Sequence, residues 1–409
     1  MKFLKDVFIN ILSQGLFLAV QQIILFPVFE SQLGQYEFGW FLLIYGIFNV
    51  MVVTISTSFT NLYQKKFNEY VEEYNQRTAY YTYYKRLIFY VFIMSIFSVN
   101  LIFFTHLKFI EFILIIILVL STASRMFLMV WYRVLRQFNM ILIVNVLLSV
   151  LYAMLFFIDF HNVVSILIGF IIIEILINTL VYIITQINIK NLMKARIRTF
   201  EWLSLNLIII SGFSGALMNY SDRFIIDFLL DASSITIFYI ATLPTKLMLF
   251  PFNMISSVIL SYIADTEKLT KIIKRKIIMI LPIMFIIVSG ISYLIGKILI
   301  YLLYPEYLDR ITNIYYIVTI TFGFICIDYV IRSFLLKYYS LKRKAIIDVM
   351  TLIIFVILSI SFVELYEGLL AIAIAQLVTF VMKAVVEIVI FVKLDTASKQ
   401  VNNREVDDI

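Results

Sequence analysis

The chain has 409 residues, of which 63% are hydrophobic and only 14% are charged, and its mean hydropathy is +1.00. Soluble domains are about 45–50% apolar, so this composition excludes an ordinary soluble protein. The net charge of +7 does not indicate a nucleic-acid partner, because the basic residues lie between long apolar segments. The single cysteine, Cys326, excludes an internal disulfide, and no spacing of ligand residues indicates a metal site or a cofactor.

Long apolar segments dominate the chain from its first residues. A spanning helix needs about 20 mostly apolar residues. The first apolar run is too long for a signal peptide and lacks a small-residue cleavage site, so we expect it to be retained as a span. The sequence predicts an all-α integral membrane protein with twelve transmembrane helices. The expected spans are residues 7–29, 38–60, 87–105, 109–131, 141–158, 163–186, 203–221, 236–260, 277–303, 311–336, 346–363 and 368–392.

Lysine and arginine are distributed unequally between the two sides of these spans. With a cytoplasmic N-terminus, 25 of them lie in inner segments and three, Lys108, Arg223 and Arg310, lie in outer turns. Cytoplasmic loops of membrane proteins carry such an excess of basic residues. We therefore expect both termini to be cytoplasmic, with residues 393–409 forming a polar cytoplasmic tail without structure.

The chain also carries a faint internal duplication. Residues 32–49 match residues 229–246 in pattern, each with a polar outer turn followed by an aromatic-rich entry into an inward-going helix. Transporters are often built from two such halves, with a substrate site between them. The pattern predicts two six-helix bundles, residues 1–200 and residues 201–392, around a central cavity.

Basic residues inside the predicted spans are the candidates for a substrate site, because charge at that depth is costly unless it has a partner or a wet cavity. Lys246 lies near the middle of the eighth span, between two prolines that are expected to kink the helix. It can pair with a buried acid such as Glu174, or it can face the cavity and bind a diphosphate. The candidate substrate-binding residues are Lys246, Arg125, Asn49, Arg332 and Lys383.

Several of these residues have alternative interpretations. Arg125 is near the inner end of the fourth span and can extend to the membrane surface instead of lining a cavity. Arg332 follows Asp328 by four residues, a spacing that favours a local ion pair. Glu174, at the centre of the sixth span, can titrate during transport or serve as a counter-ion. Glu174 and Asp328 are therefore the candidates for binding a coupling ion.

The order of landmarks resembles that of the MOP superfamily of exporters, and within it the polysaccharide-unit flippases of the Wzx type. The segments that carry the resemblance are LGQYEFGWFLL at 33–43, NYSDRFIIDFLLDASSITIFYIA at 219–241, and the basic turns after the fourth and tenth spans. The resemblance implies a flippase that moves undecaprenyl-diphosphate-linked oligosaccharides to the outer leaflet of the bacterial plasma (inner) membrane by alternating access. It also implies a role in O-antigen, lipopolysaccharide or capsule assembly, with membrane lipids, a glycan polymerase and a chain-length regulator as partners.

Two other classes of function stay open. A MATE-like cation-coupled multidrug antiporter predicts that carboxylates dominate the buried charges, whereas basic residues are at least as numerous here. A membrane polysaccharide polymerase or lipid-linked glycosyltransferase usually carries catalytic residues on a large outer loop, and the predicted outer turns are all short. The sequence also lacks the glycine-rich phosphate loop of ATP-driven proteins. We therefore expect a transporter that is not an enzyme and binds neither a cofactor nor nucleic acid.

Overall fold

The computed structural model describes residues 2–70, 72–102, 108–197, 200–263, 269 and 271–401, and none of them lies in a β-strand. The helices lie within a few residues of most of the expected spans. The α-helices are α1 (Lys2–Ala19), α2 (Phe26–Lys66), α3 (Glu73–Ile102), α4 (Phe109–Leu128), α5 (Val130–Val134), α6 (Phe138–Met154), α7 (Val163–Ile184), α8 (Ile189–Lys194), α9 (Trp202–Leu229), α10 (Ala232–Ile263), α11 (Lys271–Leu303), α12 (Leu308–Tyr338), α13 (Leu341–Val363) and α14 (Gly368–Val401).

Among these described residues, nine helices are long and apolar enough to cross a membrane, or ten when the bent α9 is counted as one span. One of the nine, Leu12–Gln64, contains 53 residues. At 1.5 Å per residue it would extend about 80 Å, more than twice the thickness of a bilayer core. Gly34 interrupts it with φ of 76° and ψ of 169°, which allows two successive crossings. The chain is a multi-pass helical membrane protein, and the count of twelve spans stays a prediction.

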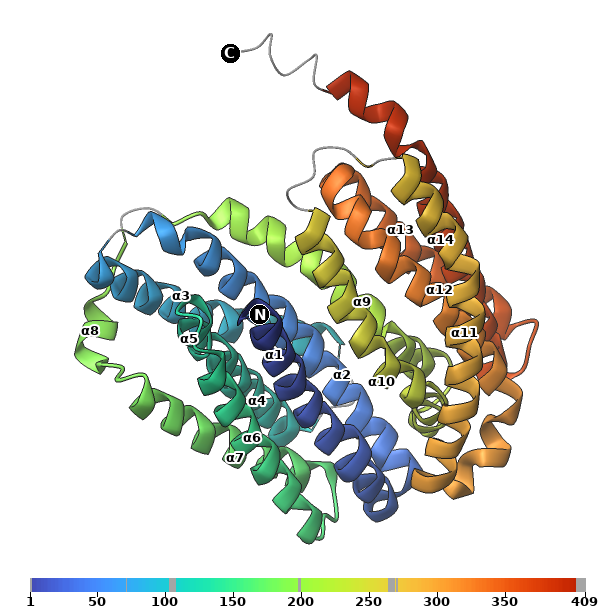
Figure 1. Ribbon diagram of the computed structural model, residues 1–409. Coiled ribbons are helices and arrows are strands. Elements are labelled where there is room, and N and C mark those ends of the chain that lie inside the picture. The colour runs from blue at the N-terminus through green and yellow to red at the C-terminus, as the bar shows by residue number, and fades with distance from the viewer. Residues whose placement is uncertain are drawn as a thin grey trace. The chain divides into compact units, whose positions relative to one another are not determined.

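The first of two compact units comprises residues 1–223. In it, α4 packs against α2, α3 and α7, while α1 packs against α6 (Figure 1). Aromatic rings fill much of this core: Phe26 meets the rings of Phe41 and Tyr45 edge to face, at centroid distances of 5.4 and 5.3 Å. Aromatic pairs in this geometry add stability beyond the apolar area they bury. Many of the chain's phenylalanine and tyrosine residues are therefore structural.

The second unit comprises residues 224–409 and is organised around α12, which packs against α10, α11 and α14. Side chains of α11 lie close to the backbone of α12 at Gly323. A Cβ atom there would lie 2.6 Å from a ring carbon of Phe285, so only glycine fits without displacement of that ring. The units divide between Arg223 and Phe224. The domain boundary expected at residue 200 stays a prediction.

The C-terminal segment differs from the expected structureless tail. Helix α14 continues past Lys393 to Val401, and residues 402–409 lie outside the described part of the chain. The reason is local: no glycine or proline occurs between Leu369 and Val401, so nothing in the sequence stops the helix at the end of its apolar part.

The expected orientation can be tested with a reporter that is active only outside the cytoplasmic membrane. Fusion after Lys393 is expected to give an inactive reporter, and insertion beside Arg310 an active one, because the basic residues hold their segments on the cytoplasmic side. Reporter activity is measured in intact cells, with immunoblotting to correct for expression. An active reporter after Lys393 would contradict the predicted orientation.

Candidate functional site

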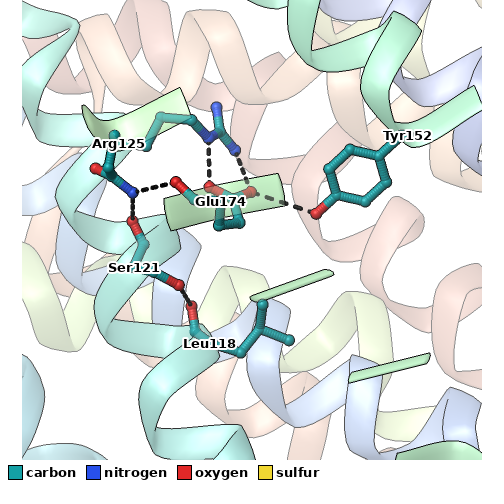
Figure 2. Close-up of polar contacts among 6 residues, drawn as sticks. Leu118, Ser121, Arg125, Tyr152 and Glu174 are labelled. Carbon is teal, nitrogen blue, oxygen red and sulfur yellow. Dashed lines mark hydrogen bonds and ion pairs between the residues drawn. The ribbon is translucent and has the colours of Figure 1, made fainter. Parts of the chain in front are cut away.

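Arg125 of α4 and Glu174 of α7 form a buried ion pair in the core of the first unit. The Arg125 Nε–H donates to Glu174 Oε2 at 2.7 Å and an Nη2–H donates to Oε1 at 3.1 Å (Figure 2). The Tyr152 hydroxyl also reaches Oε1, at 3.4 Å. Arg125 is 8% exposed and Glu174 is 1% exposed. Two parallel hydrogen bonds of this kind give a strong and geometrically specific interaction.

Asn178, one turn after Glu174, links α4 and α7 by hydrogen bonds next to this ion pair. Its Nδ2 donates to the backbone carbonyls of Ser121 on α4 at 2.8 Å and of Glu174 on α7 at 2.7 Å. Side-chain amides that bridge helices in this way satisfy polar groups that lipid cannot hydrate. The register between α4 and α7 is therefore set by both a charge pair and an amide bridge.

The position of this pair bears on the alternatives left open for Arg125 and Glu174. Arg125 does not extend to the membrane surface, because its guanidinium is buried against Glu174. Glu174 is the counter-ion of Arg125, which leaves the pair neutral while both groups are ionised. Breaking such a pair by removing one partner costs about 3–5 kcal/mol. The geometry gives both residues a structural role and leaves a role in transport as a prediction.

A larger ionic network occupies the second unit. Lys383 of α14 pairs with Asp328 of α12 at 3.1 Å and with Asp348 of α13 at 3.2 Å. Lys344 of α13 pairs with Asp348 at 2.7 Å and with Glu387 of α14 at 2.8 Å. The two lysines and Glu387 are each less than 9% exposed. Three helices are thus linked by alternating positive and negative groups.

Two further features complete this network. The carboxyl groups of Asp328 and Glu387 interact electrostatically with each other. Arg332 interacts electrostatically with Asp328 and with Asp348. The expected local pair between Arg332 and Asp328 is therefore only part of the arrangement, because the close ion pair of Asp328 is with Lys383 on another helix. Spacing along one helix could not show this partner.

Lys246 lies on α10 and Asn49 lies on α2. Lys246 is half-buried and lies 14 residues after the start of α10, about 21 Å along the helix and near its middle. Helix α10 continues through Pro244 and Pro251. Asn49 lies in α2, where its Nδ2 donates to the carbonyl of Tyr45 at 2.8 Å. The matched segments 32–49 and 229–246 align Asn49 of the first unit with Lys246 of the second. This correspondence between the two units stays a prediction.

Two basic residues expected in turns are buried within helices. The span boundaries predict an inner turn at Lys344, yet this residue lies in α13, is 2% exposed and is paired within the second unit. The useful signal was its spacing of four residues from Asp348. The span boundaries predict an outer turn at Arg223, but α9 continues to Leu229 and Arg223 is 3% exposed. The apolar run after Arg223 was the available signal for a longer helix.

Arg223 fills a notch created by Gly46 on α2. Its Nη1–H donates to the backbone carbonyl of Leu42 at 2.6 Å. A Cβ atom on Gly46 would lie 3.3 Å from Arg223 Cδ and 3.6 Å from its Nη1. The missing side chain at Gly46 therefore makes room for a guanidinium between α9 and α2.

Replacing Gly46 with leucine is expected to displace Arg223 and to destabilise the protein by about 1–3 kcal/mol, the usual cost of overpacking. Melting of the detergent-purified protein measures the effect. Gly290→Leu is the matched control, because a Cβ atom on Gly290 would meet nothing within 4 Å. The loss should shrink when Arg223→Ala is combined with Gly46→Leu, since the two side chains compete for one space. Equal melting temperatures of Gly46→Leu and the wild type would contradict the claim that Gly46 makes room for Arg223.

No protein-family model matches the chain, and no curated protein matches it by sequence. Solved structures do match. A MATE multidrug-resistance transporter of the MOP superfamily in its inward-facing conformation gives a TM-score of 0.66 at 12% identity, covering 96% of each chain. A MATE in complex with MaL6 gives 0.63 at 13% identity, covering 97% of each chain.

A third structure is a MOP transporter from Pyrococcus furiosus, described as having a binding pocket of reverse polarity that suggests a different function. It gives a TM-score of 0.61 at 13% identity, covering 97% of this chain and 96% of that one. The fold is that of the MOP transporters. These neighbours are transporters and not enzymes, and at this identity the similarity shows the fold alone.

Proposed function

We propose that the chain is a flippase that moves undecaprenyl-diphosphate-linked oligosaccharides from the cytoplasmic to the outer leaflet of the bacterial plasma membrane. The observation that carries the proposal is Lys246, a half-buried basic residue at the middle of α10. An ammonium at that depth attracts phosphate oxygens strongly, because water screens the attraction poorly there. The MOP fold supports alternating access as the mode of transport.

The pairing of three of the buried acids supports an anionic substrate over a cationic one. Glu174 pairs with Arg125, Asp328 with Lys383 and Glu387 with Lys344. Carboxylates already neutralised by fixed cations have little attraction left for a cationic drug. The third neighbour supplies an analogy, since its binding pocket is described as having a reverse polarity that suggests a different function.

A MATE-like multidrug antiporter is the second candidate, favoured by the descriptions of the first two neighbours.

Both candidates need a coupling ion, and Asp328 and Glu174 stay the proposed groups for it. Asp328 has the additional support of its electrostatic interaction with Glu387. Two carboxylates close together repel each other, and a shared proton would relieve that repulsion. A glycan polymerase and a chain-length regulator are the partners proposed for the flippase.

Reconstitution into vesicles distinguishes the two candidates. The purified chain is incorporated with a fluorescent undecaprenyl-diphosphate oligosaccharide, and a membrane-impermeant quencher reports how much of the lipid has crossed. The flippase proposal predicts quenching beyond the outer-leaflet half in vesicles with protein and none beyond it in empty vesicles. Exchange of ethidium for protons, without movement of the lipid-linked glycan, would replace the flippase with the antiporter.

A further inference from the structure

The short helix α8 follows the inner end of α7, and the turn between them is closed by specific hydrogen bonds. The backbone N–H of Gln186 donates to the carbonyl of Ile183 at 3.1 Å, and that of Ile187 donates to the carbonyl of Tyr182 at 3.2 Å. Gln186 adopts a left-handed φ of 53°. This pair of bonds around a left-handed residue is a Schellman motif, which ends a helix at a defined place. The direction in which the chain leaves α7 is therefore fixed.

Helix α8 is then held against the rest of the first unit. Asn188 caps it, with Oδ1 accepting from the backbone N–H of Asn191 at 3.2 Å. Lys85 of α3 donates through Nζ to the carbonyls of Met193 at 3.0 Å and of Ala195 at 2.7 Å. These bonds satisfy carbonyls at the end of α8 that would otherwise lack helical partners. A six-residue helix is marginal by itself, and this anchoring explains why it forms.

The exposed surface of α8 is amphipathic. Ile189 is 64% exposed and Met193 is 73% exposed, and the two lie one turn apart on the same face. Lys190 and Lys194, both exposed and also one turn apart, flank this apolar pair at about 100° around the helix. Arg196 is exposed just beyond the helix. In water such an arrangement would leave two large apolar side chains uncovered.

The distance along the chain places α8 at the edge of the membrane. The apolar helix α7 ends at Ile184, and α8 starts only five residues later at Ile189. Amphipathic helices with basic flanks lie in the headgroup region, where the apolar face reaches the acyl chains and the basic groups meet anionic lipids. We propose that α8 is an interfacial lipid-binding site, with Ile189 and Met193 inserted and the basic residues on anionic headgroups. The predicted topology assigns this site to the cytoplasmic leaflet.

Single-cysteine labelling tests the insertion. In a Cys326→Ala background, Met193→Cys or Asn191→Cys is labelled with a small fluorophore, and the whole protein is reconstituted into phosphatidylcholine vesicles with phosphatidylglycerol. Position 193 is expected to be quenched at least roughly twofold more by a lipid with a shallow acyl-chain quencher than by aqueous iodide. Position 191, on the opposite side of α8, is expected to show the reverse preference and serves as the matched control.

A second comparison tests whether α8 prefers anionic lipids. Removing phosphatidylglycerol is expected to lower lipid quenching at position 193, and the Lys190→Gln and Lys194→Gln pair is expected to abolish this dependence on lipid charge. Iodide quenching at 193 as strong as at 191 would overturn the insertion. Protection of 193 from both quenchers would also overturn it, because another protein segment would then cover the face. Equal lipid quenching with and without phosphatidylglycerol in the otherwise unmodified protein would overturn the anionic preference.

Discussion

Replacement of Lys246 by alanine is expected to abolish export of the lipid-linked glycan while leaving the amount of protein in the membrane unchanged. The proposed substrate carries its charge on the diphosphate, and loss of the ammonium would remove the attraction that brings it into the protein. Lys246→Arg should restore part of the export, because the charge is retained while its size and geometry change. Surface glycan and membrane abundance are measured on the same cells.

The matched control for Lys246→Ala is Lys297→Ala. Lys297 also lies within a predicted span, in α11, but its side chain is exposed. Its removal changes the net charge by the same amount, so export should persist if position matters and not total charge. A structural role for Lys246 predicts another outcome, in which the alanine variant loses abundance together with export. Normal abundance with normal glycan would remove Lys246 from both roles.

The helical architecture was predictable because each span must satisfy its own backbone hydrogen bonds in lipid. The apolar runs therefore located most of the helices to within a few residues, as α4, α7 and α12 show. The predicted helix ends were wrong where a helix continues beyond its apolar part or contains a buried charged residue. Helix α9 contains Arg223, and α14 continues beyond Lys393, although both residues looked like boundaries.

The candidate site was predictable in its residue types but not in its pairings. The sequence singled out Arg125, Glu174, Asp328 and Lys383 because they are charged inside apolar segments. Arg125 and Glu174 lie 49 residues apart, and only the packing of α4 on α7 brings them together. The same holds for Lys383, whose two partners come from α12 and α13. Local spacing reports neighbours along one helix and is silent about contacts between helices.

The second large effect is expected for Arg125→Ala, which strands the buried carboxylate of Glu174 without its partner. The loss of stability should be about 3–5 kcal/mol, measured as reduced melting temperature and reduced membrane abundance. Glu174→Gln should cost less than Arg125→Ala, because the amide oxygen still accepts a hydrogen bond from Arg125. The double variant Arg125→Met with Glu174→Leu should recover most of the stability, because both charges are replaced by apolar groups of similar volume.

Transport by the same variants separates structure from coupling. If Glu174 exchanges a proton during each cycle, Glu174→Gln exports no glycan even after correction for the amount of protein that reaches the membrane. The stable Arg125→Met and Glu174→Leu variant is then inactive as well. If the pair only holds α4 against α7, the double variant exports glycan at a rate that follows its abundance. Full export by Glu174→Gln would remove Glu174 from coupling and leave Asp328, which interacts electrostatically with Glu387, as the proposed coupling group.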